Sequence, residues 1–387
     1  MWTGACTSQV GTQMQTAAQS WLVYDLSMHS SFFLGLDQFL GQIPIVLLSL
    51  LGGVFADRHD RRRVLLGSQY LQMTCAFLLA TLVFTGVVHV WHILCLSFVV
   101  GVAQSFGGPA YSALVPSLVP REQLQNAIAL NSIQFNLARV IGPALGGIAL
   151  IKLGAAWNFT FNGISFVAVI ITLYMIQTAF VPAKSREPIM TSMKEGIRFM
   201  RQQPGMESLI VLAFCMTTLG FPLIGFLVVF AEDVFHGGTQ TFTLLLSCSG
   251  AGAVTGALIV AGLGRLKKQG QTAMIMLAVL GVFTMAFSRS PSAPIACIML
   301  FLAGASLMAV FSMITTLVQT IIPDNMRGRV MSVYNLALRG GGPVGSLLAG
   351  SVMIPHFGAP LTFTIAGGLQ ICLAVYFLTV NRRVAVL

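Results

Sequence analysis

The chain has 387 residues, of which 56% are hydrophobic and only 8% are charged, and its formal net charge is +10. A soluble domain typically has about 25% charged residues, so this composition excludes an ordinary soluble enzyme or binding domain. The basic residues stand in short clusters between long apolar runs, which is typical of membrane topology rather than of nucleic-acid binding. We therefore expect a helical protein of the lipid bilayer that binds no nucleic acid.

Apolar runs of about 20 residues, the length that spans a bilayer, recur along the whole chain. They predict an all-α membrane protein with twelve transmembrane helices in two pseudo-symmetric six-helix bundles. The predicted spans are 2–24, 33–55, 64–87, 91–115, 126–151, 156–178, 208–230, 241–263, 272–288, 293–319, 330–354 and 360–380.

The longest polar stretch lies between the sixth and seventh spans and divides the chain into three parts. These are an N-terminal bundle (1–178), a linker (179–207) and a C-terminal bundle (208–387). Within the linker, "TSMKEGIRFMRQQ" has the composition of a short amphipathic helix on the membrane surface. Most of the 21 Lys and Arg residues follow the even-numbered spans, so the positive-inside rule predicts cytoplasmic termini and a cytoplasmic linker.

Spans 1 and 2 carry unusual polar residues. Gln9, Gln13 and Thr16 recur at roughly one-turn spacing in span 1, which predicts a polar stripe facing a wet interior. Asp37 is the one acid well placed within a span. A low-dielectric environment disfavours a charged carboxylate, so such a group has a raised pKa and can take up and release a proton. Asp37 is our candidate for proton coupling, and the alternative is a position in the wet outer mouth of span 2.

The loop after span 2 reads "GGVFADRHDRRR". Its spacing resembles the GxxxDRxxRR signature of the major facilitator superfamily, although Asp60 stands where the family often has Gly. The matching residues are Gly53, Asp57, Arg58, Arg61 and Arg62. The resemblance implies that Asp57 latches the cytoplasmic ends of the two halves together, near the start of span 11 at 329–332. The alternative is that these charges only set topology.

The two halves echo one another in spans 5 and 11. Both "ARVIGPALGG" and "LRGGGPVGSLLAG" place a proline four residues after an arginine, with an offset of 200 between them. A helical proline leaves the carbonyl four residues earlier without its bond, and here that carbonyl belongs to the arginine. We interpret the pair as a hinge and interface element used twice, comprising Arg139, Gly142, Pro143, Gly146, Gly147, Arg339, Gly342 and Pro343. Direct contact of the arginines with substrate or with Asp37 is the alternative.

In the family that the loop resembles, spans 1, 4, 7 and 10 line the transport cavity, and spans 2, 5, 8 and 11 meet between the halves. The resemblance implies that the glycines of the latter spans lie at this interface, where small residues permit close helix contact. It also makes further polar residues candidates for cavity lining beside Gln9, Gln13 and Thr16. These are Gln104 and Tyr111 in span 4, and Ser312 and Thr316 in span 10.

No ATP-binding loop and no nucleophile–base pair is visible, so the sequence predicts no enzyme and no cofactor. The seven cysteines form no CxxC motif and lie inside apolar segments, and the six histidines share no ligand spacing. We interpret the cysteines as small buried hydrophobic residues and expect no metal.

The segments "VPREQLQNAIALNSIQFNLARVIGPALGG" and "EGIRFMRQQP" are similar to the superfamily branch of bacterial drug and siderophore exporters. That branch includes the enterobactin exporter and macrolide efflux proteins. The resemblance implies a monomeric transporter of the bacterial inner membrane that works by alternating access. It would export an amphiphilic small molecule in exchange for protons. An importer or lipid flippase of the same fold and a non-transporting membrane scaffold are the alternatives.

Overall fold

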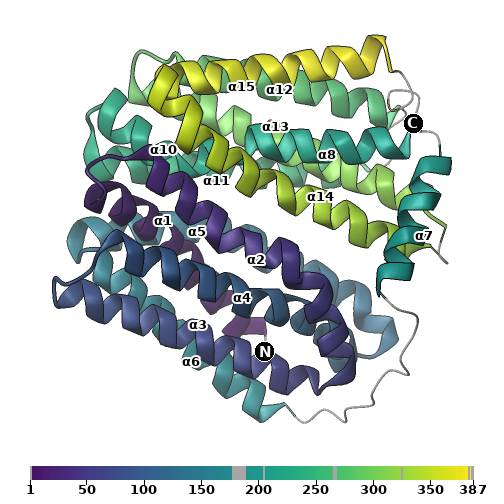
Figure 1. Cartoon of the computed structure of the whole chain (residues 1–387), viewed down its shortest axis with the longest axis horizontal. Helices are drawn as coiled ribbons and strands as arrows, with labels where there is room; N and C mark the ends of the chain where they lie inside the picture. The colour runs from purple at the N-terminus through teal and green to yellow at the C-terminus, as the bar shows by residue number, and fades with distance from the viewer. Residues whose placement is uncertain are drawn as a thin grey trace. The chain divides into compact units, whose positions relative to one another are not determined.

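The structure, a computed structural model, describes residues 2–176, 189–203, 205–264, 268–323, 326–381 and 384. These residues are almost all helical and include no strand. Helices are expected for a chain in lipid, because each backbone N–H and C=O must then find its partner within the protein. The chain divides into two compact units, Met1–Arg186 and Glu187–Leu387 (Figure 1).

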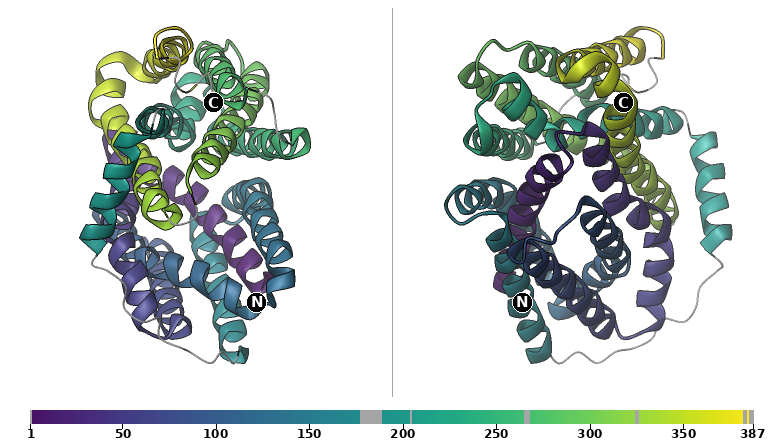
Figure 2. Two further views of the ribbon diagram at one scale, coloured as in Figure 1. Left: turned by 90° about the vertical axis from the view of Figure 1, so that its right-hand side faces the viewer. Right: turned by 60° about the vertical axis from the view of Figure 1, so that its left-hand side comes forward.

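The first unit is built from six long helices, and two short 3₁₀ turns precede the fifth. In chain order they are α1 (Trp2–Leu26), α2 (Ser31–Arg58), α3 (Arg61–Phe84), α4 (Val90–Leu114), η1 (Val115–Leu118), η2 (Arg121–Gln123), α5 (Leu124–Lys152) and α6 (Ala155–Met175). Helix α1 packs against α5 and α6, while α4 packs against α2 and α3. The helices run side by side, as Figure 2 shows from two further directions.

The second unit has the same helical plan with more interruptions. Its elements are α7 (Ile189–Gln202), α8 (Met206–Gly220), α9 (Pro222–Gly225), α10 (Leu227–Val229), the π-helical η3 (Phe230–Val234), α11 (Gly238–Leu263), α12 (Gln269–Ser288), α13 (Ala293–Ile321), α14 (Arg327–Leu348), the π-helical η4 (Ala349–Met353) and α15 (Ile354–Thr379). The predicted seventh span is therefore not one helix but α8 to η3. Within α15, Gly358 has a φ of 75°, which a glycine adopts without strain, and the helix bends there.

Ten helical runs in the described residues are long and apolar enough to cross a membrane. One of them, Gly328–Thr379, is 52 residues long and contains the eleventh predicted span and all but the last residue of the twelfth. Helix α1 is not among the ten, because its polar residues lower its hydropathy. The all-α membrane fold is thus confirmed, and the count of twelve spans stays a prediction.

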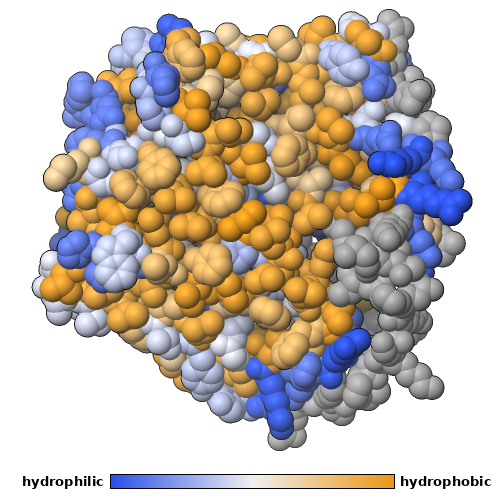
Figure 3. All heavy atoms as spheres, in the orientation of Figure 1, coloured by the Kyte–Doolittle hydropathy of each residue, from blue (hydrophilic) through white to orange (hydrophobic). Residues whose placement is uncertain are grey.

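The surface supports a location in lipid. On the face drawn in Figure 3, hydrophobic residues cover most of the described surface. Large apolar side chains such as Leu47, Leu258 and Ile298 are exposed. Of the predicted linker 179–207, residues 179–188 and 204 lie outside the described residues, and the segment expected to be amphipathic is α7.

Candidate functional site

Asp37 of α2 is enclosed by protein and held by two neutral side chains. Only 7% of the residue is exposed. The Nε2 of Gln19 on α1 donates to both carboxylate oxygens, at 3.0 and 2.9 Å, and also to Ser97 Oγ at 2.9 Å. The Ser97 hydroxyl on α4 donates to Oδ1 of the same carboxylate at 2.5 Å. Among the described residues no base pairs with Asp37, so this site joins three helices around a single ionisable group.

A second polar cluster joins α1 to α6. The Nδ2 of Asn162 donates to Gln15 Oε1 at 2.6 Å, and its Oδ1 accepts from Thr12 at 3.4 Å and from Ser165 at 3.2 Å. One turn earlier on α6, Asn158 is fully buried with no hydrogen-bond partner for its amide among the described residues. Polar groups thus follow the same side of α1 from Thr12 to Gln15.

The bonded side of α1 differs from the predicted stripe. Gln9 and Gln13 are half-buried and Thr16 is exposed. The Thr16 hydroxyl bonds within its own helix, to the carbonyl oxygen of Thr12 at 2.9 Å. Sequence reasoning missed Gln19, and the available signal was its one-turn spacing from Gln15. It also missed Ser97, which lies alone in an apolar run and gave no signal.

The other predicted cavity residues are spread over two units. In α4, Gln104 is exposed, and the Tyr111 hydroxyl donates to Asn131 Oδ1 on α5 at 3.0 Å. In α13, Ser312 is half-buried and its carbonyl accepts from the exposed Thr316 at 2.9 Å. Tyr111 thus fastens α4 to α5, while the assignment of all four residues to a transport cavity stays a prediction.

A cavity of about 480 Å³ lies elsewhere in the first unit, between α2, α3 and α4. It is lined by Phe55, His59, Asp60, Arg63, Val64, Gly67, Ser68, Leu71, Val102, Ala103 and Phe106. None of the predicted cavity residues borders it.

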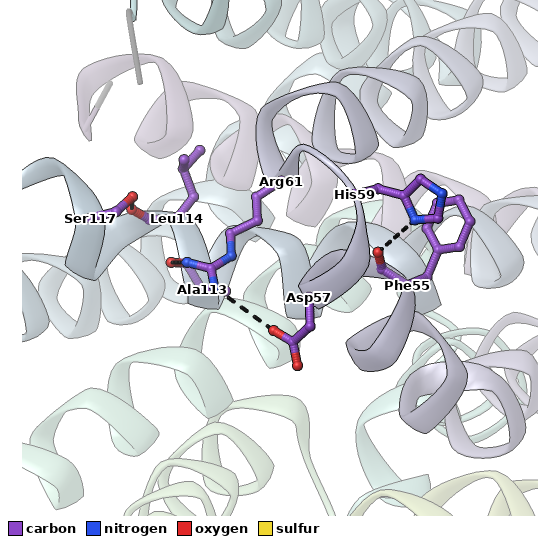
Figure 4. Close-up of polar contacts among 7 residues, drawn as sticks. All are labelled: Phe55, Asp57, His59, Arg61, Ala113, Leu114 and Ser117. Carbon is purple, nitrogen blue, oxygen red and sulfur yellow. Dashed lines mark hydrogen bonds and ion pairs between the residues drawn. The ribbon is translucent and has the colours of Figure 1, made fainter. Parts of the chain in front are cut away.

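The signature loop is tied to its own unit. Asp57 is exposed at the end of α2, and Arg61 Nη2 lies 3.8 Å from its Oδ1 (Figure 4). The same guanidinium donates from Nη1 to the carbonyl of Ala113, near the end of α4, at 3.1 Å. Arg58 is exposed, and an added Cβ on Gly53 would meet no described atom within 4 Å. The latch to span 11 stays a prediction, since these contacts concern one unit only.

Arg62 closes the end of another helix. Its Nε donates to the carbonyl of Leu173 at 2.7 Å and its Nη2 to that of Tyr174 at 3.0 Å. The guanidinium also lies 5.7 Å from the centre of the Tyr174 ring. The last carbonyls of a helix lack partners within it and carry partial negative charge, so a cation stabilises them. Arg61 and Arg62 therefore anchor the start of α3 to the ends of α4 and α6, a role that the signature spacing did not predict.

The glycines of spans 5 and 11 bring helices of one unit together. An added Cβ on Gly146 would lie 2.8 Å from the Cα of Met14 on α1, and Gly142 also meets α1. In the second unit, Gly341 and Gly345 approach α8 in the same way. Close contact at these glycines was expected, but the helices they contact belong to their own unit. Their role at an interface between halves stays a prediction.

The packing shifts the predicted repeat by one residue. Gly342, the sequence partner of Gly142, has only ordinary contact, because its added Cβ would lie 3.8 Å from the Cβ of Phe221. The tight approach falls on Gly341 instead. The run 340–342 is all glycine, so α14 can present any of these positions to α8.

The arginine–proline pairs lie within continuous helices. Pro143 and Pro343 are buried, and neither α5 nor α14 is interrupted at its proline. Gly147 is buried as well. Arg139 is half-buried, whereas Arg339 is exposed and forms no hydrogen bond or ion pair among the described residues. The hinge role of both pairs stays a prediction.

One contact at the start of α14 was not expected. Arg329, near the predicted landing point of the latch, forms an ion pair of 2.5 Å with Glu195 on α7. Both side chains are partly exposed. Helix α7 therefore holds the start of α14 within the second unit.

A family model and several similar proteins all assign the chain to one family of membrane transporters. The family model described as a transmembrane secretion effector matches residues 1–386. Macrolide efflux protein A of Streptococcus pyogenes is 23% identical over 363 residues, which cover 91% of this chain and 88% of that protein. The staphyloferrin A transporter of Staphylococcus aureus is 26% identical, with coverages of 94% and 91%. The enterobactin exporter EntS of Salmonella choleraesuis is 27% identical, with coverages of 84% and 78%.

Solved structures show the same fold at low sequence identity. A D-xylose–proton symporter has a TM-score of 0.78 at 13% identity, covering 98% of this chain and 96% of that one. A bacterial homologue of the iron transporter ferroportin in the inward-facing state has a TM-score of 0.73 at 17% identity, covering 98% and 97%. The resemblance predicted from the signature loop is thus confirmed, and the protein is a transporter and not an enzyme. The chain belongs to the transmembrane secretion effector family of the major facilitator superfamily of multi-pass membrane transporters.

Proposed function

We propose that this transporter exports an amphiphilic small molecule by alternating access and takes up protons in exchange, with Asp37 as the proton-carrying group. The observation that carries the proposal is the enclosed Asp37 carboxylate, held by Gln19 and Ser97 with no basic partner among the described residues. A carboxylate in such surroundings gains most from neutralisation by a proton. The relatives named for macrolide efflux and enterobactin export support the direction and the substrate class.

Protonation of Asp37 would change the hydrogen bonds that join α2 to α1 and α4. The charged carboxylate accepts two bonds from Gln19 of α1 and one from Ser97 of α4. A protonated Asp37 is itself a donor, so at least one of these contacts must exchange donor for acceptor. Loading a proton therefore changes what joins α1 to α2, and this change is the coupling step that we propose.

Transport by purified protein in proteoliposomes tests the proposal. A macrolide and a catecholate siderophore serve as probes, each with and without an imposed pH gradient. We expect gradient-driven flux in the wild type, and none in Asp37→Asn, which retains exchange at equal pH. The matched control is Asp25→Asn, because Asp25 is exposed at the end of α1, and its flux should match the wild type. Wild-type flux that does not respond to the gradient, or gradient-driven flux that survives in Asp37→Asn, would rule out this coupling.

For the conformational cycle, we propose that the bundles 1–178 and 208–387 rock against each other, with the linker 179–207 between them. Asp57 acts as the cytoplasmic latch, and the two arginine–proline pairs act as hinges. Asp57→Asn should then lower the transport rate and leave substrate affinity unchanged. Arg139→Ala and Arg339→Ala should both slow conformational exchange. A change in substrate selectivity alone would contradict the hinge role.

We also propose that the protein is a monomer in the bacterial inner membrane with cytoplasmic termini. Reporter fusions at both ends test the orientation, and the mass of the detergent-solubilised protein tests the oligomeric state. Import would appear as flux of a probe in the opposite direction in the same vesicles. Lipid flipping would appear as movement of lipid from one leaflet to the other. A non-transporting scaffold predicts no flux of any probe.

A further inference from the structure

Helices α11 and α13 of the second unit are packed backbone to backbone. An added Cβ on Gly252 would lie 2.7 Å from the carbonyl carbon of Phe301, and one on Gly256 would lie 2.7 Å from that of Ala305. In the other direction, Gly304 of α13 meets the backbone of Ser249 on α11. The two helices therefore run parallel, and Gly252 and Gly256 of α11 each lie against the α13 residue 49 positions later.

This register places two cysteines opposite each other. One turn before Gly252 is Cys248, and one turn before Phe301 is Cys297. Cys297 is 8% exposed and Cys248 is half-buried, and both stand one turn before the positions at which α11 and α13 touch backbone to backbone. The sequence did not indicate the pair, since the two residues are far apart along the chain.

Two thiols at facing positions of two packed helices form a chelating site for a soft acceptor. Thiolate sulfur prefers soft cations and thiophilic elements over hard ones such as Mg²⁺. The second thiol is already in place, so its bond forms intramolecularly and strengthens binding over a single thiol. The apolar surroundings in the helix pair favour an uncharged reagent over a hydrated ion.

We propose that Cys248 and Cys297 form a dithiol site for soft thiophilic acceptors, with trivalent arsenicals as the class that fits it. In the reaction with hydrated phenylarsine oxide, two arsenic–oxygen bonds break and two arsenic–sulfur bonds form. The two thiol protons leave with the two hydroxyl groups as water. Arsenic stays trivalent, so the step requires no oxidant or reductant. The adduct clips α11 to α13 at a point where the glycines already hold them together.

The test uses the full-length protein in detergent, phenylarsine oxide as the probe and intact mass as the readout. A 2-mercaptoethanol chase removes arsenic held by single thiols, and ethanedithiol then removes arsenic held by two. We expect one adduct per chain that survives the first chase and is lost in the second. Because chelation strengthens binding by about 100-fold or more, Cys248→Ala and Cys297→Ala should each lose it in the first chase.

Cys215→Ala is the matched control, since Cys215 is a half-buried thiol on α8, and it should keep the resistant adduct. The thermal unfolding midpoint of each variant checks folding, and serine replaces alanine where a variant is unstable. A resistant adduct that persists in either the Cys248 or the Cys297 variant would overturn the proposal. The absence of any resistant adduct in the wild type would do the same.

Discussion

Gly52 and Gly53 are neighbours in α2, but an alanine should be tolerated at only one of them. An added Cβ on Gly52 would lie 2.9 Å from the carbonyl carbon of Ser105 and 3.1 Å from the Cα of Phe106, both on α4. These are backbone atoms and cannot rotate away. At Gly53 the same Cβ would meet no described atom within 4 Å. The signature loop includes Gly53 and not Gly52. The signature therefore predicts that alanine is harmful at Gly53, whereas the packing predicts that it is harmful at Gly52.

Overpacking of this kind costs about 1–3 kcal/mol, whereas alanine in place of an exposed helical glycine gains up to about 1 kcal/mol. Gly52→Ala should therefore destabilise the first unit by about 2 kcal/mol. For a unit of this size that lowers Tm by roughly 4–8 °C. Gly53→Ala should leave Tm unchanged or raise it slightly.

Thermal unfolding of both variants in the same detergent, followed by intrinsic fluorescence and by loss of the monodisperse peak, measures the difference. Equal midpoints, or a lower midpoint for Gly53→Ala, would refute the assignment of the α2–α4 contact to Gly52. If Gly53→Ala keeps its stability but loses transport, then Gly53 serves the conformational cycle and not the packing of its own unit.

Three further substitutions address contacts within one unit. Arg62→Lys should lower the free energy of unfolding by roughly 1 kcal/mol, because a lysine cannot bridge both α6 carbonyls; Arg63→Lys, at an exposed site, should not. Tyr334→Phe removes the bond to α13 and should cost about 1 kcal/mol, measured against the exposed Tyr376→Phe. Glu195→Gln should cost less than about 1 kcal/mol, and high salt should abolish the difference from wild type. Equal effects in variant and control, or an effect of Glu195→Gln that salt leaves unchanged, would contradict these assignments.

Hydropathy predicted most helices because a bilayer imposes one length and one composition on every span. It failed at the seventh span, where Gly220, Pro222 and Gly225 divide an apolar run into short pieces. Apolar composition indicates that such a segment lies in the membrane. The path of its backbone depends on its glycines and prolines and on the neighbouring helices.

The candidate site was predicted in part. Asp37 could be found because an acid in an apolar run is rare. Its partners Gln19 and Ser97 could not be found, because a hydrogen bond between helices depends on how each helix is rotated about its axis. Polar periodicity alone predicted a polar stripe on a different side of α1. In the same way, the signature identified Arg61 and Arg62 as a motif but not the carbonyls that they bind.

Helix α1 and its counterpart in the second unit differ in stiffness. From Trp2 to Leu26 the hydrogen-bond ladder of α1 is continuous, and α5 and α6 brace it along its length. The segment from Met206 to Val234 is interrupted at Phe221 and at Phe226, and it changes from α-helix to π-helix at Phe230. A force applied at one end of α1 is transmitted to the other end, whereas the same force on the second segment is absorbed at its joints. The two halves of the repeat have the same helical plan, but the first has one rigid helix where the second has several short helices joined by breaks.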